Sequence, residues 1–160
     1  DLTIGGAPGP RRVLGGCLKP YKIVPMPTAQ ANKQPCPVTA QQIACHLSIL
    51  GTNLLDPIDE YIKSQGWRLS INSGFRSKEV NDSVGSKDSS QHRLGCAADI
   101  RVSGMTPDEV VKAIIQTDIQ FDQMIREFDS WVHISVANTE QETPRNQVLI
   151  IDKLGTRPYK

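Results

Sequence analysis

Proline and glycine divide the chain near residue 37 into two parts with different capacity to fold. Residues 1–37 contain two Gly-Gly pairs, a Pro-Gly-Pro run and five further prolines. Proline lacks a backbone donor and clashes with the preceding helical turn, so no helix can run through this stretch. We therefore predict an extended N-terminal arm or linker over 1–37 and a globular domain over 38–160.

The bulk composition fits one such domain and disfavours two classes of partner. A chain of 160 residues can bury a sizeable core. Eighteen basic against seventeen acidic residues leave a net charge of +1, so charge gives no reason to expect nucleic acid or a membrane surface. No apolar run approaches the roughly 18–20 residues of a membrane span. Because the chain begins at Asp1 rather than Met, we expect it to be a piece of a longer protein.

The cysteines leave two interpretations open. None of the four (Cys17, Cys36, Cys45 and Cys96) shows Cys-x-x-Cys spacing, which disfavours a cysteine-based zinc site. Cys36 could pair with Cys45, and Cys17 with any of the others, so the connectivity is undetermined. Alternatively, most of them are free thiols buried as small hydrophobic residues.

Hydrophobic periodicity predicts the elements of the domain. A helical region begins after Thr39, which forms a capping box with Gln42, is broken or kinked at Gly51 and ends at Gly66. Its buried stripe comprises Ile43, Leu47, Leu50, Leu54, Leu55, Ile58 and Ile62. Strands are predicted near 67–72, 96–102, 121–128, 131–136 and 147–151, with a short helix near 78–84 and a helix starting at Thr106. This order lacks regular βαβ alternation, so we predict an α+β domain with an antiparallel or mixed sheet and packed helices.

Two of the predicted strands each present one potential metal ligand opposite an apolar face. Side chains alternate along a strand, so Asp99 and His133 lie on the polar faces of their strands. Gly95 can let the chain fold back, which would bring His92 toward Asp99. Neutral imidazole and carboxylate are the ligands that a catalytic zinc ion uses when one position is left open for water. His46 has no second ligand nearby, and we interpret it as a hydrogen-bonded or surface residue.

Three motifs then appear in order along the chain. They are Ser73-Gly74-Phe75-Arg76-Ser77, the pattern Ser-x-His-x-x-Gly-x-Ala-x-Asp from Ser90 to Asp99, and Trp131-Val132-His133. With these motifs the stretch 73–135 resembles the M15 zinc peptidases, the D-Ala-D-Ala carboxypeptidase family, and most closely its bacteriophage branch. The resemblance covers about 39–151.

The resemblance implies a hedgehog- and DD-peptidase-like fold and a Zn²⁺ ion held by His92, Asp99 and His133. Arg76 would contact a carboxylate or carbonyl of the substrate, a role that suits a planar, permanently charged guanidinium. Ser90 and Trp131 are assigned to substrate binding.

The same resemblance implies a substrate and a setting. The family cleaves peptide bonds in the stem peptides of bacterial peptidoglycan, often next to D-amino acids. The chain would then be a lysis enzyme acting in the bacterial periplasm or cell wall, or the wall-cutting part of a phage tail or virion protein. Which peptide bond is cleaved stays open, because carboxypeptidases and endopeptidases of the family share the same ligands.

The general base is the point at which this chain departs from the better-known pattern. Many family members place an acid three residues before the last histidine, where this chain has Ser130. A three-residue turn at 128–130 would pair Glu127 with Trp131, on the face of His133, whereas a two-residue turn would point Glu127 away. The resemblance to the phage branch favours Glu127 as the base, and Asp129 is the second candidate.

Two readings of other classes compete with an enzyme. One is a non-catalytic binding module of the same fold, with or without zinc, which the missing acid at Ser130 favours and the intact zinc triad disfavours. The other is a structural part of a virion or of a secreted protein that is held together by disulfides. The Pro/Gly-rich arm and the four cysteines favour this interpretation.

Overall fold

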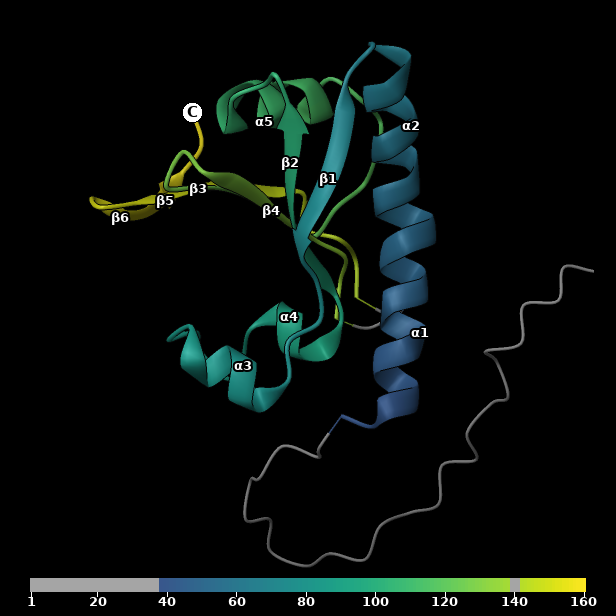
Figure 1. Ribbon diagram of the computed structural model, residues 1–160, viewed down its shortest axis with the longest axis vertical. Helices are drawn as coiled ribbons and strands as arrows, with labels where there is room; N and C mark the ends of the chain where they lie inside the picture. The colour runs from purple at the N-terminus through teal and green to yellow at the C-terminus, as the bar shows by residue number, and fades with distance from the viewer. Residues whose placement is uncertain (1–37, 139–141) are drawn as a thin grey trace, which may run out of the picture. The chain divides into compact units, whose positions relative to one another are not determined.

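The computed structural model describes residues 38–138 and 142–160, and all structural statements below concern these residues. The predicted arm over 1–37 lies outside them, as do Cys17 and Cys36. The described chain begins with three consecutive helical segments, α1 (Ala40–Leu50), η1 (Gly51–Leu55) and α2 (Asp56–Ser64), which form one continuous rod (Figure 1).

The rod begins as predicted but continues through Gly51. Thr39 and Gln42 form the capping box, in which each side chain bonds the backbone N–H of the other residue. Of the break or kink predicted at Gly51, the break is wrong, because a π-helical segment that begins at Gly51 continues the helix. The fully buried side chains follow at intervals of four residues: Leu50, Leu54, Ile58 and Ile62. That interval exceeds the α-helical repeat of 3.6, and the wider π turn keeps the stripe on one face.

Six strands form a mixed sheet in the order β1-β2-β4-β3-β5-β6. Their bounds are β1 Arg68–Ser73, β2 Ala97–Ser103, β3 Gln123–Glu127, β4 Trp131–Ser135, β5 Gln147–Asp152 and β6 Gly155–Pro158. Only the β3–β5 pairing is parallel. The α+β class with a mixed sheet is therefore confirmed. The sequence patterns predicted five of the strands and missed β6, a four-residue edge strand.

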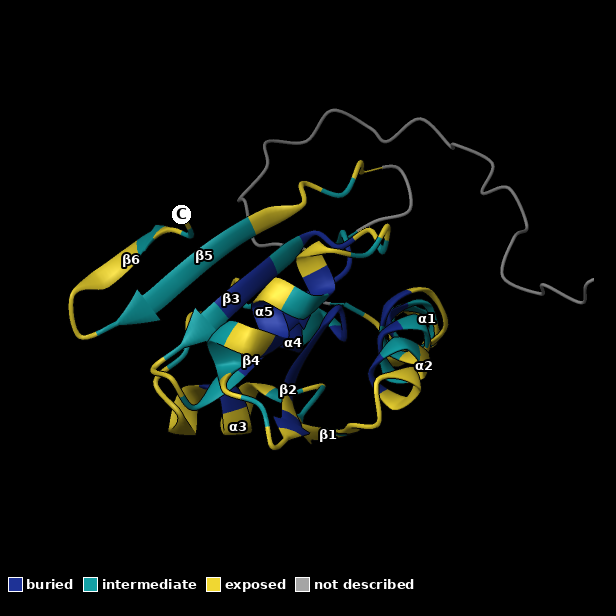
Figure 2. Cartoon of the chain, turned by 90° about the horizontal axis from the view of Figure 1, so that it is seen from above, coloured by how far each residue is buried: buried dark blue, intermediate teal, exposed yellow. Residues whose placement is uncertain are grey.

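The two faces of the sheet are used differently. One face packs against the rod and against α5 (Pro107–Ile115), through Ile100, Met124 and Val132 among others. The helices α3 (Lys78–Ser83) and α4 (Gln91–Leu94) lie well below α5 in Figure 1. Figure 2 shows the central strands buried, with β5 and β6 half-buried or exposed at one end of the sheet. The polar face of β2 and β4 is thereby free to carry a site.

Two composition-based expectations can be compared with the fold. No helix in the described ranges is long and apolar enough to cross a membrane. Cys96 is buried in the core, where burial raises the pKa of its thiol to about 11 and keeps it protonated. Cys45 lies half-buried on α1, and a pairing with Cys17 or Cys36 falls outside the described residues.

Asp108, in the first turn of α5, links the C-terminal segment to the domain through hydrogen bonds. Its Oδ1 atom accepts hydrogen bonds from the Tyr159 hydroxyl at 2.8 Å and from Arg126 Nη1 at 3.0 Å. Hydrogen bonds, first from Lys112 and then from Tyr159, lower the pKa of Asp108 to about 2. A carboxyl group whose pKa is lower in the folded than in the unfolded state stabilises the folded state while the carboxyl group is ionised.

We expect Asp108→Asn to reduce stability at neutral pH but not in strong acid. The stabilisation is complete above the ordinary pKa of 3.8 and is lost as the pH falls toward 2. The free energy of unfolding should fall by about 1 kcal/mol at pH 7, since solvent screens this partly exposed carboxylate. Urea unfolding at pH 7 and near pH 2 measures the difference. Asp82→Asn, in an exposed pair with Lys78, serves as the control with little expected effect.

Candidate active site

The sheet register places two of the predicted metal ligands side by side. Asp99 on β2 is the direct antiparallel partner of His133 on β4. His92 approaches from α4, so that His92 Nε2, Asp99 Oδ1 and His133 Nδ1 are each 3.1 Å from the other two. All three residues are buried, and no other group of this kind occurs in the part of the chain that the structure describes. The three residues that sequence patterns singled out therefore converge on one point.

The short helix α4 is not among the predicted helices, and its packing explains how the His92 side chain is oriented. Ser90 caps the helix by accepting a hydrogen bond from the His92 backbone N–H. Gly95 ends it with φ of +75°, a left-handed conformation that glycine adopts without strain. A Cβ at Gly95 would lie only 3.1 Å from the Ile43 carbonyl oxygen on α1. The glycine of the motif thus allows α4 to pack closely against the rod.

The contact of His92 with the backbone determines which of its ring nitrogens faces the cluster as an acceptor. His92 Nδ1 lies 2.7 Å from the Gly74 carbonyl oxygen, which can only accept, so Nδ1 carries the proton. His92 Nε2 then presents a lone pair toward Asp99 Oδ1, which also carries lone pairs. A buried cluster of acceptors is costly unless a proton or a cation lies between them.

The dimensions of the cluster fit a zinc ion. Zinc bonds of about 2.0–2.1 Å at tetrahedral angles separate neighbouring donor atoms by about 3.3 Å. The observed separations of 3.1 Å are close to this value. Two imidazole nitrogens and one carboxylate oxygen form a donor set typical of catalytic zinc, with a backbone carbonyl orienting His92 from behind.

Arg76 lies against Asp99. Its Nη2 atom donates to Asp99 Oδ2 at 2.5 Å, and its Nε donates to Ser73 Oγ at 3.0 Å. Burial opposes the charged form of Asp99, but the adjacent His133 and His92 rings outweigh it and hold the pKa of Asp99 below its ordinary value. With Oδ2 occupied by Arg76, Oδ1 is the oxygen directed to the two histidines. Arg76 therefore orients the carboxylate, in addition to any substrate contact predicted for it.

Glu127 occupies the position that the three-residue turn predicts. Glu127 pairs with Trp131, and the turn between them carries Phe128 and Asp129 with φ of 49° and 50°. This register puts Glu127 on the face of His133, where Glu127 Oε2 accepts a hydrogen bond from Trp131 Nε1 at 3.0 Å. Burial raises the pKa of Glu127, so its carboxylate is a stronger base than an exposed one.

The second candidate base is placed differently. The Asp129 side chain is 71% exposed and forms an ion pair with Arg126 at 2.9 Å. The register therefore favours Glu127 over Asp129 as a base at the His92–Asp99–His133 cluster.

Gln91 is a residue whose importance the sequence hardly signalled. Its Nε2 atom lies 3.0 Å from Asp122 Oδ2, 3.2 Å from the Val136 carbonyl oxygen and 2.9 Å from Asn138 Oδ1. Asp122 is buried and also bonds both Nε and Nη2 of Arg145. Gln91 thus ties α4 to the ends of β3 and β4, next to His92. Its place beside His92 in the Ser-Gln-His run indicates, from the sequence, a residue that could orient this segment or line the cleft.

We expect Gln91→Leu to weaken metal binding without removing a ligand. The change leaves buried acceptors without their donor, which should lower the free energy of unfolding by about 1–3 kcal/mol. Loss of a group that supports a metal ligand typically reduces zinc affinity about 10–100-fold. Competition with a zinc chelator measures the affinity, and Gln65→Leu, at the exposed end of α2, is the control. Unchanged zinc affinity in Gln91→Leu would refute the positioning role.

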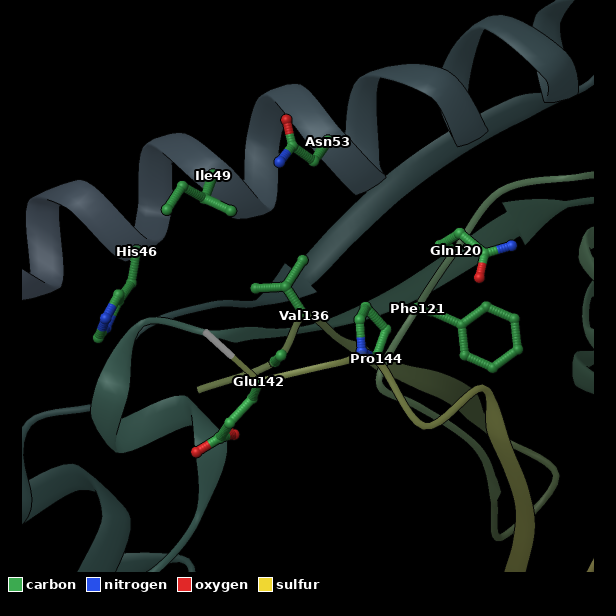
Figure 3. Close-up of a pocket in the computed structure, with 9 residues that line it drawn as sticks. His46, Ile49, Asn53, Gln120, Phe121, Val136, Glu142 and Pro144 are labelled. Atoms are coloured by element: carbon green, nitrogen blue, oxygen red, sulfur yellow. The ribbon is translucent and has the colours of Figure 1, made fainter. Parts of the chain in front are cut away.

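His46 is hydrogen-bonded, as interpreted from the sequence. Its Nδ1 atom lies 2.7 Å from the Leu94 carbonyl oxygen, which links α1 to α4. His46 also lines a pocket of about 340 Å³ in which α1 faces Val136 and Glu142 (Figure 3). None of the three converging residues lines this pocket.

The three motifs that carry these residues lie within a match to a known protein family. A family model described as Peptidase M15 matches residues 28–135, which include all three motifs. The chain belongs to the M15 peptidase family. The comparison with curated proteins gives no match. The family match ends at the last residue of β4, so β5 and β6 lie beyond the matched range.

Membership of the M15 family makes the chain a peptidase. M15 peptidases are zinc enzymes, and the buried His92–Asp99–His133 group is the place in this M15 peptidase that could bind the metal. The resemblance inferred from the motifs is therefore confirmed at the level of the family.

Proposed function

We propose that this M15 peptidase is a zinc-dependent hydrolase of peptide bonds in peptidoglycan stem peptides and that it derives from a bacteriophage. The observation that carries the proposal is the convergence of His92 Nε2, Asp99 Oδ1 and His133 Nδ1, with Glu127 on the same face of the sheet. The likeness of the three motifs to the phage branch supports the cell-wall substrate.

The residues of the site have different roles in the proposed reaction. His92, Asp99 and His133 would hold the zinc ion, which supplies a Lewis acid and a water molecule of lowered pKa. Glu127 accepts a proton as water attacks the carbonyl carbon of the scissile amide. The same residue returns that proton to the leaving nitrogen as the C–N bond breaks. Trp131 holds one oxygen of Glu127 through its indole N–H and so fixes the direction of the carboxylate.

Arg76 has two tasks in this proposal. Its Nη2 atom is committed to Asp99, and the rest of its guanidinium, which is only partly buried, can meet a carbonyl or carboxylate of the substrate. Ser90 contributes by capping α4, and contact of Ser90 or Trp131 with the substrate is part of the proposal.

The test is digestion of purified peptidoglycan by the zinc-loaded protein. We expect new amino groups to appear, zinc to be present at one ion per chain, and activity to disappear with a chelator and return with zinc. Zinc binding without release of amino groups would contradict a hydrolase and favour a non-catalytic binding module. Release of amino groups by metal-free protein would contradict zinc dependence.

A further inference from the structure

The segment between the first two motifs contains a buried polar residue that the proposed function does not use. Asn81 lies on α3, between the motif at 73–77 and the motif at 90–99. It is 0% exposed, whereas every other residue of α3 is exposed to solvent. The helix thus has no apolar face to bury against the domain. Hydrogen bonds of Asn81, rather than apolar packing, are therefore expected to hold this part of the chain in place.

The side-chain amide of Asn81 is committed to the turn that follows α3. Its Nδ2 atom donates to the Ser86 carbonyl oxygen at 3.1 Å and to the Lys87 carbonyl oxygen at 3.0 Å. The Ser86 backbone N–H donates in return to the Asn81 carbonyl oxygen at 3.1 Å. One buried residue therefore holds the exposed turn at 85–87 from several sides.

The amide oxygen shows which part of the Asn81 side chain matters. Asn81 Oδ1 is buried without a hydrogen-bond partner, and it is the one side-chain atom of this kind within 38–138 and 142–160. An unmade acceptor in the interior is costly, and an apolar side chain of similar size would avoid that cost. The two amide donors, and not the filling of space, therefore explain an asparagine at this position.

The Lys87 carbonyl oxygen connects Asn81 to the start of the motif that carries two metal ligands. It accepts a second hydrogen bond, from the Ser90 backbone N–H at 3.0 Å. Ser90 is the N-cap of α4, which contains the ligand His92. Figure 1 shows α3 and α4 next to each other below the sheet. A helix of four residues is too short to be stable alone, so the turn before it decides where it begins.

A shift of α4 would reach two of the proposed ligands. The His92 carbonyl oxygen accepts a hydrogen bond from the Arg76 backbone N–H at 3.1 Å, and His92 Nδ1 donates to the Gly74 carbonyl oxygen at 2.7 Å. Arg76 in turn donates to Asp99 Oδ2. The position of α4 therefore affects both the ring of His92 and the residue that orients Asp99.

We propose that Asn81 is a positioning residue for the metal site. By holding the turn at 85–87, its two amide donors fix the place at which α4 begins and hence the direction of the His92 ring. Asn81 acts through the turn and α4, without a contact to the metal or the substrate. The proposal rests on zinc binding by His92, Asp99 and His133, which is part of the proposed function.

Two substitutions remove the donors and keep a side chain of similar size. Asn81→Asp places a carboxylate against two carbonyl oxygens, and Asn81→Leu leaves those oxygens without a donor. We expect either change to weaken zinc binding about 10-fold, the lower end of the loss caused by removing a group that supports a metal ligand. Competition with a zinc chelator measures the affinity.

Ile58→Val is the matched control for a loss of stability. Ile58 lies in the hydrophobic core on α2, and loss of one buried methyl group lowers the thermal stability of the fold. Because Ile58 does not contact the turn at 85–87 through any hydrogen bond, the control should bind zinc as the wild type does.

Hydrogen exchange of the metal-free protein separates local positioning from a general loss of stability. In Asn81→Asp, the backbone amides of Ser90 and Arg93, which close the bonds before and within α4, should exchange at least about 10-fold faster. The increase should be smaller for the amides of β2 and β4. In Ile58→Val, the amides of the strands should be affected at least as much as those of α4.

The outcomes distinguish this proposal from a merely structural role. Unchanged zinc affinity in both Asn81 variants would overturn it, as would an equal loss of affinity in Ile58→Val. Exchange that increases equally in α4 and the sheet would also overturn it. If the wild-type protein binds no zinc, the proposed function fails, and the exchange rates alone decide whether Asn81 positions α4. Should both variants fail to fold, Asn81→Ser, which keeps a single donor, must still bind zinc more weakly than the wild type for the proposal to stand.

Discussion

Glu127→Gln is expected to abolish peptide hydrolysis while zinc binding is retained. Gln has the same shape as Glu but cannot accept a proton, so kcat should fall by about 10²–10⁴-fold, the usual contribution of a general base. The residue is not one of the three converging ligand residues, so zinc content should stay the same. Release of amino groups from peptidoglycan gives the rate, and elemental analysis of the same sample gives the zinc content.

Asp129→Asn is the matched control for this experiment. Asp129 lies two residues from Glu127 but is exposed and paired with Arg126. It should keep nearly all activity. If Asp129→Asn lost activity and Glu127→Gln kept it, the register argument for the base would be wrong. Loss of zinc from Glu127→Gln would show instead that Glu127 supports the metal.

His133→Ala is expected to lose both zinc and activity. Removing one of three donors should reduce zinc affinity by more than the 10–100-fold that loss of a supporting group causes. Zinc at about 1,000 times its Kd would stabilise the wild-type fold by about 4 kcal/mol and raise its Tm by about 10 °C. The variant should show almost no such rise. Thermal unfolding with and without zinc measures the difference.

Two further variants test whether the result with His133→Ala reflects loss of zinc binding rather than damage to the fold. Asp99→Asn retains size and polarity while removing the charge, so it should also lose the zinc-dependent rise in Tm without a cavity in the sheet. His46→Ala removes a half-buried histidine that bonds Leu94 and lies outside the converging group. It should keep the rise. A full zinc-dependent rise in both His133→Ala and Asp99→Asn would place the metal elsewhere.

Local sequence patterns predicted a structural feature correctly where that feature depends on residues close together in the sequence. The Thr39 capping box, the helix start at Thr106 and the alternation in β2 and β4 appear in the structure as predicted. The predicted apolar stripe of the rod is buried at Leu50, Leu54, Ile58 and Ile62, but Leu47 is 38% exposed. The same alternation indicated that Asp99 and His133 share a face. The sequence allowed two turn lengths after Glu127, one of which places Glu127 on the face of His133. Only the observed pairing of Glu127 with Trp131 decides between these turns.

Other features could not be read from local patterns because contacts far apart in the sequence decide them. The π turn through Gly51 forms because tertiary burial of Leu54 outweighs the tendency of glycine to interrupt a helix. The helix α4 has four residues, too few for a periodic signal, and is stabilised by contacts with distant segments such as the bond between Gln91 and Asp122.

The class of the fold and the choice of His92, Asp99 and His133 as candidate metal ligands could be predicted from the sequence, because strand alternation and motif spacing are local properties. Only the tertiary structure decided that these atoms meet at 3.1 Å, that Arg76 holds the second oxygen of Asp99, and that Glu127 lies on the face of His133. The physical reason is that strand order and register bring together residues separated by tens of positions. In the folded structure the adjacent His133 and His92 rings hold the pKa of Asp99 down, and burial raises the pKa of Glu127.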